Sequence, residues 1–403
     1  MTVDTNPDKI EALLSRSVKE ILPDKEALRE RLMSGERLRI YIGTDATGTS
    51  LHLGHSTNYL VMERFRELGH EAIFLVGDFT SRIGDPTDKS DAARKQLSRE
   101  EVVANTKTWL SQVAPIIKVD DPVNPVKVMY NHDWLASLNF EDIIGLASHF
   151  TVQQMIERDM FEKRLRENKP LYLHELFYPL MQGYDSVAME VDIELCGSDQ
   201  TFNALAGRTL LKKLKDKEKF VFVTTLLENP KTGEKMMSKS EGTGVYLDFP
   251  PETMYGAVMA QPDENMRQLF VDCTTLPLGE IDEIFTTETN PRDIKMRLAF
   301  EITKLYHGES GAGAGQAHFV QAFQSKQVPE EVLEIAQPYL ENLLQTEVVA
   351  SKSELRRLFE AGGVRVVPSE EKLTELPESV AEPLVLRIGK RRFVRLLPQS
   401  TND

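Results

Sequence analysis

The chain has 403 residues, of which 41% are hydrophobic and 28% charged, and its formal net charge is −15. This length allows two or three domains with a substantial core, and the acidic balance excludes a protein that is basic over its whole surface. The two cysteines, Cys196 and Cys273, are too few for a disulfide framework, and no stretch has signal or membrane length, so we expect a cytoplasmic protein with no membrane partner.

The first elements predicted along the chain form a strand–helix–strand unit. Residues 38–43 (LRIYIG) are a short apolar run that ends in glycine, which predicts a buried strand. Residues 53–68 carry apolar side chains at helical spacing before Gly69, and residues 71–79 predict a second buried strand. This order predicts a parallel sheet with a right-handed crossover.

The middle of the chain is mostly helical in pattern. Residues 91–177 predict a helical insertion or layer beside the sheet, residues 221–227 predict a further strand, and residues 251–328 are helical again. The last segment predicts a basic amphipathic helix, a glycine pair and three short strands. From residue 349 onward it has ten Lys and Arg against eight Asp and Glu, which suits contact with an anionic partner.

The predicted fold class is α/β with four parts. We expect a Rossmann-like, parallel-sheet catalytic domain over residues 1–250, which includes an N-terminal helical segment and the helical insertion. An α-helical middle domain is expected over 251–328, a linker over 329–348, and a small α+β RNA-binding domain over 349–403.

Two histidines flank a glycine where the first helix begins, at His52, Gly54 and His55. In doubly wound sheets, ligands bind beyond the carboxyl ends of the strands, where helix N-termini present free N–H groups. Imidazoles there can donate hydrogen bonds to phosphate oxygens, and a glycine lets a nucleotide approach the backbone. By itself the motif is equally consistent with a turn that happens to contain histidines.

A second signal is the polar loop EKMMSKSEG, residues 234–242, which follows the strand predicted at 221–227. A mobile lysine such as Lys239 can reach the phosphates of ATP and stabilise a pyrophosphate leaving group. Loops rich in lysine and serine are usually just solvated, but this one follows the histidine motif in a specific order.

A third signal lies on one predicted helical face. Tyr178, Gln182 and Asp185 occupy positions i, i+4 and i+7 of YPLMQGYD. A phenol, an amide and a carboxylate on one face make a poor core and a good amino-acid pocket. The alternative is a partly exposed polar face of a helix.

Together these motifs resemble the class I aminoacyl-tRNA synthetases, whose signatures are His-Ile-Gly-His and Lys-Met-Ser-Lys-Ser, and most closely the bacterial tyrosyl-tRNA synthetases. The resemblance extends over nearly the whole chain, through the blocks GTDATGTSLHLGH, VGDFTSRIGDPT, LFYPLMQGYDS, ELCGSDQ and MMSKS. It implies activation of tyrosine with ATP and Mg²⁺ to tyrosyl-adenylate and pyrophosphate, then transfer to the 3′ end of tRNA(Tyr). It further implies a homodimer without a prosthetic group, and we expect no resident metal.

The resemblance also implies roles for individual residues. It implies that Asp185 and Tyr41 bind the phenol of tyrosine and that Tyr178, Gln182 and Asp85 hold its α-ammonium. The tyrosine-binding set it implies is Tyr41, Asp45, Asp85, Tyr178, Gln182, Asp185 and Gln200. The ATP-binding set is Gly54, Gly197, Asp199, Ser238 and Lys239. The catalytic set is His52, His55, Lys239 and Thr47.

The chain departs from the family's usual pattern at two places. Thr44-Asp45-Ala46-Thr47 stands where the family usually has Phe-Asp-Pro-Thr. Met236 stands where the second signature has its first lysine, and Lys235 lies one place earlier, so whether Lys235 takes over that role stays open.

The terminal segment resembles the small RNA-binding domain, of the alpha-L type, shared with a ribosomal small-subunit protein and pseudouridine synthases. The blocks ASKSELRRL, GGV and GKRRFV carry this likeness, although the acidic insertions are longer than usual. The cations it implies for phosphate contacts are Lys352, Arg356, Arg357, Arg365, Lys390, Arg391 and Arg392. The middle helical domain would then lie on the anticodon side.

Two alternatives stay open on the sequence. One is a related class I enzyme such as a tryptophanyl-tRNA synthetase, against which Tyr41 and Asp185 favour tyrosine. The other is a catalytically idle paralogue that only binds RNA, against which the intact His52, His55 and Lys239 argue.

Overall fold

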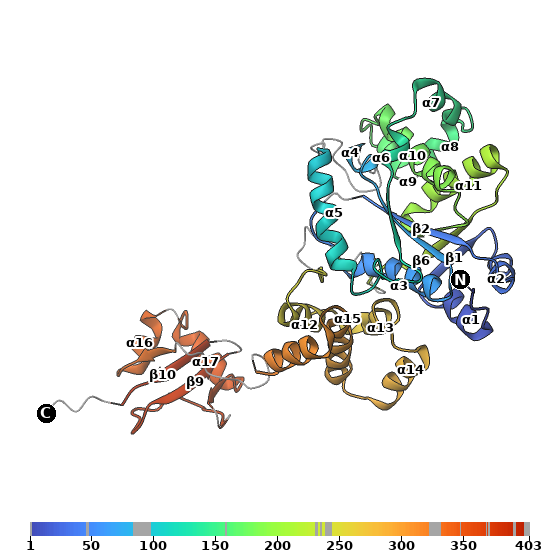
Figure 1. Ribbon diagram of the computed structural model, residues 1–403. Helices are drawn as coiled ribbons and strands as arrows, with labels where there is room; N and C mark the ends of the chain where they lie inside the picture. The colour runs from blue at the N-terminus through green and yellow to red at the C-terminus, as the bar shows by residue number, and fades with distance from the viewer. Residues whose placement is uncertain are drawn as a thin grey trace. The chain divides into compact units, whose positions relative to one another are not determined.

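The computed structural model divides the chain into two compact units, residues 1–316 and 317–403 (Figure 1). Each unit is described by itself. The described residues are 2–45, 48–83, 98–157, 159–229, 233, 236–237, 244–321, 332–346, 348–367, 369, 371–389 and 392–398.

The first unit is built on a six-stranded sheet with the order β1-β6-β5-β2-β3-β4. Its strands are β1 (Val18–Leu22), β2 (Arg39–Thr44), β3 (Glu71–Val76), β4 (Lys127–Tyr130), β5 (Ile193–Gly197) and β6 (Phe220–Thr224). All neighbouring pairs are parallel except β1 with β6. The predicted parallel, Rossmann-like sheet is confirmed, with one antiparallel edge strand.

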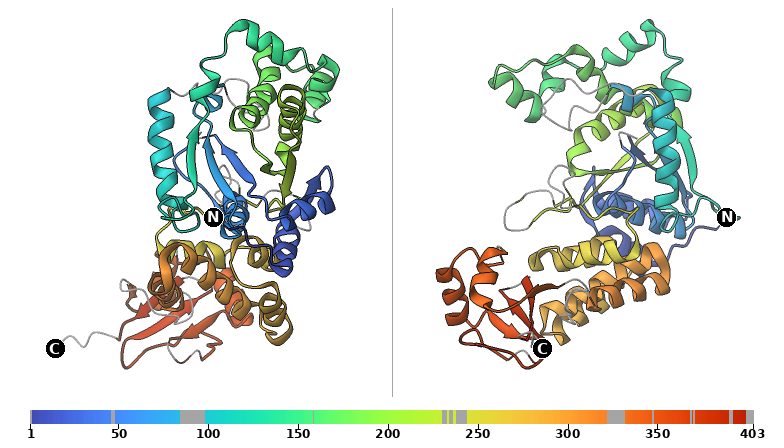
Figure 2. Two further views of the ribbon diagram at one scale, coloured as in Figure 1. Left: turned by 45° about the vertical axis from the view of Figure 1, so that its right-hand side comes forward. Right: turned by 90° about the vertical axis from the view of Figure 1, so that its left-hand side faces the viewer.

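Helices cover both sides of this sheet (Figure 2). From β2 the chain crosses through α3 (Leu53–Glu67) to β3, and from β5 it crosses through α11 (Thr201–Lys215) to β6 on the other side. Right-handed crossovers in these two directions place α3 and α11 on opposite faces. The strand order therefore reverses between β2 and β5, which is where such sheets bind ligands.

The remaining helices of this part flank the sheet or form the insertion between β3 and β5. They are α1 (Pro7–Ser15), α2 (Lys25–Met33), α4 (Thr80–Ile83), α5 (Arg99–Val113), α6 (His132–Leu135), α7 (Phe140–Ala147), α8 (Val152–Ile156), α9 (Asp159–Arg166) and α10 (Leu173–Met189). The helix predicted over residues 53–68 corresponds to α3, which buries Tyr59 and Phe65 completely.

Three strands of this six-stranded sheet were not predicted, each for a reason visible in its sequence. β4 lies inside the stretch expected to be helical, and it is a four-residue edge strand in which no residue is fully buried. β1 carries Lys19 and Glu20, and β5 carries Glu194 in an otherwise apolar run. Charged residues interrupt the hydrophobic pattern by which a strand is recognised.

The helical prediction for the middle of the chain is confirmed over residues 251–321, which contain no strand. The helices there are α12 (Pro251–Met259), α13 (Met266–Cys273), α14 (Leu278–Thr287) and α15 (Pro291–Phe319). Buried Arg16, next to α1, joins this region to the sheet because it donates hydrogen bonds to the carbonyl oxygens of Val271, Thr274 and Leu276 at 2.8, 2.6 and 2.5 Å. None of the described helices is long and apolar enough to cross a membrane.

The second unit is a four-stranded sheet with the order β7-β10-β9-β8 and two helices. Its elements are β7 (Leu333–Ile335), α16 (Tyr339–Gln345), α17 (Lys352–Glu360), β8 (Val364–Val366), β9 (Leu384–Ile388) and β10 (Arg392–Leu396). The expected linker over 329–348 is corrected here, because β7 pairs with β10 and Ile335, Tyr339 and Leu343 are buried in the core. The folded unit therefore includes residues ahead of 349.

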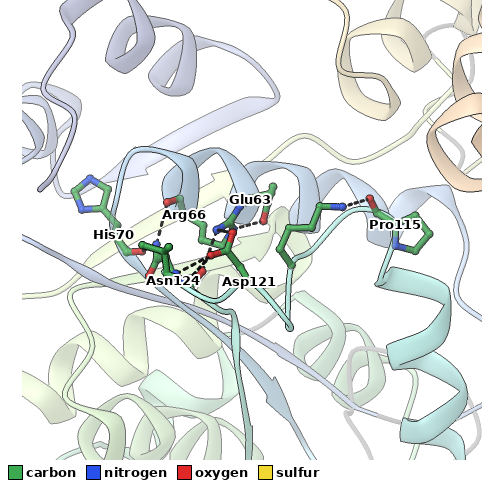
Figure 3. A network of polar contacts seen from close by, with 8 residues as sticks. Glu63, Arg66, His70, Pro115, Asp121 and Asn124 are labelled. Atoms are coloured by element: carbon green, nitrogen blue, oxygen red, sulfur yellow. Dashed lines mark hydrogen bonds and ion pairs between the residues drawn. The ribbon is translucent and has the colours of Figure 1, made fainter. Parts of the chain in front are cut away.

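A polar cluster joins the end of α3 to the loop before β4 (Figure 3). Arg66 forms two hydrogen bonds to the carboxylate of Glu63, at 2.7 and 2.8 Å, and one to Asp121 at 3.2 Å. Asn124 Nδ2 donates to the carbonyl oxygens of Arg66 and His70 at 3.0 and 2.9 Å. The cluster lies where β3 begins, so it stabilises the end of the sheet opposite the carboxyl ends of the strands.

Candidate active site

The two histidines lie at the start of α3, as predicted, with His52 at the N-cap and His55 in the first turn. The His52 N–H donates to His55 Nδ1 at 3.2 Å, and the two ring centroids are 3.9 Å apart. Because Nδ1 of His55 accepts this bond, the neutral ring carries its proton on Nε2. His55 is therefore a hydrogen-bond donor through Nε2, and Gly54 lies between the two rings in sequence.

The residues on either side of the lysine-and-serine loop lie next to the histidine motif. Leu53 N–H donates to Val245 O at 3.0 Å, and Leu247 N–H donates to Leu51 O at 2.9 Å, so residues 245–247 lie beside the start of α3. On the other flank, Met237 Sδ accepts from Val245 N–H at 3.4 Å. Both flanks of residues 238–243 are thus held next to the histidines.

Several predicted site residues lie outside the described part of the chain. They are Thr47, Asp85, Ser238 and Lys239, together with Lys235, whose role was left open. Met236, which stands in the place of the first signature lysine, is buried and its N–H donates to Leu227 O at 3.0 Å.

Asp45, the residue after β2, and Tyr178 on α10 are brought together in the site. Tyr178 donates its hydroxyl to Asp45 Oδ2 at 3.0 Å, and Thr80 donates to Asp45 Oδ1 at 2.6 Å. A Cβ at Gly77 would overlap both Asp45 Oδ1 and Thr80 Oγ1. The turn after β3 therefore needs glycine so that this carboxylate can sit against it.

Asp185 is buried and accepts two hydrogen bonds, from Trp134 Nε1 at 2.7 Å and from Asn131 Nδ2 at 3.3 Å. Burial raises the pKa of its carboxyl well above the usual range, the two donors offset part of that shift, and the charges of Glu194 and Asp45 add to it. In either protonation state Asp185 can pair with a hydroxyl group, as an acceptor when ionised and as a donor when protonated.

Tyr41 lies fully buried on β2, with its hydroxyl 3.1 Å from Ser186 Oγ. Burial, followed by the charges of Glu194 and Asp185, raises the pKa of this phenol well above its usual value. Tyr41 is therefore a neutral hydroxyl, and its neighbour Ser186 lies one residue after Asp185.

Gln182 and Ser186 on α10 both contact Glu194 on β5. Gln182 Nε2 donates to Glu194 Oε1 at 2.9 Å, and Ser186 donates to Glu194 Oε2 at 3.3 Å. Glu194 also forms a buried ion pair with Lys219, which precedes β6. These groups make a polar network next to Tyr41, whose hydroxyl contacts Ser186.

Gly197, Asp199 and Gln200 lie where β5 ends, at the point of strand-order reversal. Ser198–Gln200 form a short 3₁₀ turn, and α11 starts at the next residue. Gln200 Oε1 accepts from Asn203 Nδ2 at 2.8 Å. The structure thus places the residues predicted for the ribose and carboxylate region at the carboxyl end of β5.

Sequence reasoning missed six polar residues of the site, namely Thr80, Asn131, Trp134, Ser186, Glu194 and Lys219. Asn131 and Trp134 follow β4 directly, so recognising that strand would have placed them at the ligand-binding edge. Glu194 gave a signal, because a single carboxylate within an apolar strand needs a buried partner.

The terminal cations differ in their surroundings. Lys352, Arg356 and Arg357 are exposed on α17, where Arg356 pairs with Glu360. Arg392 is instead tied to Glu354 at 2.9 Å, and Arg365 donates to Gly362 O at 3.3 Å. The other two predicted cations, Lys390 and Arg391, lie outside the described residues.

Metal ligands do not gather anywhere in the described ranges, where no group of three or more His, Cys, Asp and Glu side chains could hold an ion. The polar groups of the site are hydroxyls, amides, carboxylates and imidazoles. Such groups can bind an amino acid and a nucleotide and stabilise developing charge, without covalent participation of the protein.

Comparison with known proteins relates the whole chain to one group. Residues 33–324 match the family described as tRNA synthetases class I (W and Y). A tyrosine–tRNA ligase of Carboxydothermus hydrogenoformans is 39% identical, over 98% of this chain and 99% of its own. Tyrosine–tRNA ligase 2 of Vibrio parahaemolyticus is 40% identical, over 96% of this chain and 97% of its own.

Solved structures share the fold. A C-terminally truncated mitochondrial tyrosyl-tRNA synthetase of Aspergillus nidulans superposes with a TM-score of 0.65 at 23% identity, covering 78% of this chain and 94% of its own. Tyrosyl-tRNA synthetase of Archaeoglobus fulgidus, complexed with L-tyrosine, gives 0.59 at 19% identity, covering 77% and 100%.

Proposed function

Because the chain belongs to the class I tRNA synthetases, in the family of the tryptophan and tyrosine enzymes, we propose that the reversal point between β2 and β5 holds tyrosine beside ATP. The activity is the ligation of tyrosine to tRNA. Tyrosine is first activated with ATP to tyrosyl-adenylate and pyrophosphate, and a ribose hydroxyl at the 3′ end of tRNA(Tyr) then takes the tyrosyl group and releases AMP. The observation that carries the assignment is one hydrogen-bonded network, in which Asn131 joins Asp185 to Thr80 while Thr80 and Tyr178 both donate to Asp45.

The phenol of tyrosine lies between Asp185 and Tyr41 in this proposal. Both side chains are buried, and both can pair with a hydroxyl. Phenylalanine could not form the hydrogen bond to Asp185 that the phenol hydroxyl makes, so a buried polar group would lose one of its partners, at a greater cost than a missing apolar contact. The pocket therefore selects tyrosine through its hydroxyl.

The α-ammonium lies at the other end, against Tyr178, Gln182 and Asp85, with Asp45 close to it. Tyr178 and Thr80 fix the Asp45 carboxylate by hydrogen bonds. A fixed carboxylate is a suitable partner for the desolvated ammonium group. Gln200 would lie in the carboxylate region, and Gly197 and Asp199 at the ribose. This orientation directs the tyrosine carboxylate toward the α-phosphate.

ATP, as its magnesium complex, binds at the start of α3 in this proposal. A tyrosine carboxylate oxygen forms the new bond to the α-phosphorus, and the bond from that phosphorus to the bridging oxygen of pyrophosphate breaks. His52 and His55 act as donors to the phosphate oxygens as negative charge builds there. Thr47, Ser238 and Lys239 act on the phosphates, with Lys239 stabilising the leaving pyrophosphate.

We further propose a cytoplasmic homodimer in which residues 1–250 catalyse, 251–328 face the anticodon side and the C-terminal unit binds RNA. Support for the dimer comes from exposed apolar side chains on neighbouring helices of the insertion, namely Phe140, Ile144, Val152 and Leu173. Support for RNA binding comes from the exposed cations Lys352, Arg356 and Arg357 on α17.

The decisive assay is ATP–pyrophosphate exchange with tyrosine, tryptophan and phenylalanine offered separately. We expect exchange that depends on tyrosine and is far weaker with the other two. Exchange driven by tryptophan would favour the related tryptophan enzyme. Absence of exchange with all three, in a protein that binds tRNA, would contradict the catalytic proposal.

A further inference from the structure

A buried carboxylate on β5 adjoins the proposed tyrosine site and is contacted from α10 and from the residue before β6. Glu194 on β5 is 2% exposed and Lys219 before β6 is fully buried, and the two form an ion pair. Gln182 and Ser186 on α10 each donate a hydrogen bond to Glu194, and Lys219 Nζ also donates to Ser186 Oγ at 2.8 Å. Replacing a buried ion pair with apolar groups is often neutral for stability, so a role besides stability explains this one better.

The carboxylate of Glu194 decides which way the Gln182 amide points. An ionised carboxylate only accepts hydrogen bonds, so the NH₂ group of Gln182 must be the end that faces it, at 2.9 Å. The carbonyl oxygen of Gln182 then lies on the opposite side of the amide. A carbonyl oxygen attracts an ammonium group, whereas an NH₂ group in its place would repel one.

We propose that Glu194 and Lys219 are positioning residues that orient the Gln182 carboxamide toward the α-ammonium of tyrosine. The proposal rests on the ammonium role of Gln182 given above. Glu194 supplies the acceptor, and Lys219 forms the ion pair that compensates the carboxylate's charge in a region that also contains Asp185.

Gly207 on helix α11 leaves room for the side-chain ammonium group of Lys219. A Cβ at Gly207 would lie 2.6 Å from Lys219 Nζ and 2.8 Å from Ser186 Oγ. Any side chain there would displace the lysine or the serine. The close packing of α10 on α11 thus depends on the same glycine that admits Lys219.

The test compares tyrosine with 3-(4-hydroxyphenyl)propanoate, which keeps the phenol and carboxylate but lacks the ammonium. The variants are Glu194→Gln and the double variant Glu194→Gln with Lys219→Met, which removes both buried charges and so guards against loss of folding. Lys217→Met is the matched control, because Lys217 lies two residues from Lys219 and is partly exposed, and it pairs with Asp192, 2.9 Å away, instead of Glu194. Full-length proteins are assayed by pyrophosphate exchange, with the analogue as inhibitor.

We expect both variants to raise the KM for tyrosine about tenfold, the scale of one hydrogen bond to a charged group, and to leave the analogue's inhibition constant within about threefold. In a Gln182→Ala background, Glu194→Gln should add no further rise. Lys217→Met should match the parent enzyme in both constants.

Equal increases in the KM for tyrosine and in the inhibition constant would overturn the proposal, because the ion pair would then act only on pocket shape. A full additional loss from Glu194→Gln in the Gln182→Ala background would overturn it as well. If Gln182→Ala alone leaves the KM unchanged, the ammonium role of Gln182 is wrong and the inference falls with it, which is a distinct result.

Discussion

His55 accepts a hydrogen bond from the His52 backbone, which fixes its neutral ring with the proton on Nε2. A donor held at a helix start meets charge that appears on the α-phosphate only in the transition state. Changing both His52 and His55 to Ala should lower the kcat of tyrosine-dependent exchange by roughly 100-fold or more. Tyrosine affinity, measured by equilibrium binding without ATP, should stay within about twofold. Equal losses of rate and affinity would contradict this role.

His70 gives the fold a defined pH dependence. Burial, followed by the nearby charge of Arg37, lowers the pKa of His70 from 6.5 to about 4, and its Nδ1 accepts from Leu38 N–H at 3.2 Å. As the pH falls, the unfolded chain therefore binds the extra proton before the folded protein does. The contribution of neutral His70 to the stability of the fold is complete above pH 6.5 and is lost between about pH 6.5 and pH 4.

The measurement is the free energy of unfolding in urea across that pH range for the parent and for His70→Gln. The parent should lose on the order of 3 kcal/mol more than the variant between the two ends. Since the variant keeps an acceptor but has no titrating ring, parallel curves would show that His70 does not titrate as stated.

Among the secondary-structure elements, the turn between β3 and α4 holds the Asp45 carboxylate in place. Because a Cβ at Gly77 would overlap Asp45 Oδ1 and Thr80 Oγ1, Gly77→Ala should displace that carboxylate. We expect the KM for tyrosine to rise roughly tenfold, the scale of a lost charge-assisted contact. Gly279→Ala on α14 is the control, since a Cβ there meets nothing within 4 Å. An unchanged KM in Gly77→Ala would show that Asp45 is not held by this turn.

Sequence patterns predicted those elements whose apolar residues repeat without interruption. β2, α3 and β3 were predicted almost to their ends, and the site residues carried by α10 were identified by their helical spacing. β4 was not predicted because it is short and lies at the edge of the sheet. Asn131 and Trp134, which follow β4 and donate hydrogen bonds to Asp185, were missed for the same reason. The pairing of Glu194 on β5 with Lys219, 25 residues later and just before β6, is one that no local pattern shows.

For the whole molecule, the division into two units predicts that catalysis and RNA binding separate. Deleting residues from 332 onward removes β7, α16 and the rest of the second core together, whereas a cut at 349 would leave them unpaired. The shortened enzyme should keep tyrosine-dependent pyrophosphate exchange and show a higher KM for tRNA. Its tRNA affinity should also depend less steeply on salt, because phosphate contacts are lost. Charging equal to that of the full chain at physiological salt would exclude the second unit as a tRNA contact.

The central claim is that the buried Asp185 selects tyrosine by its hydroxyl group. Trp134 and Asn131 hold this carboxyl in place, and Tyr41 lies close by on β2. The direct measurement is pyrophosphate exchange with tyrosine and with phenylalanine, for the parent and for Asp185→Ala, compared as kcat/KM. The substitution should reduce the value for tyrosine roughly 100-fold and change that for phenylalanine much less, since only tyrosine loses a partner. A tyrosine preference that survives Asp185→Ala intact would contradict the account and place the phenol elsewhere.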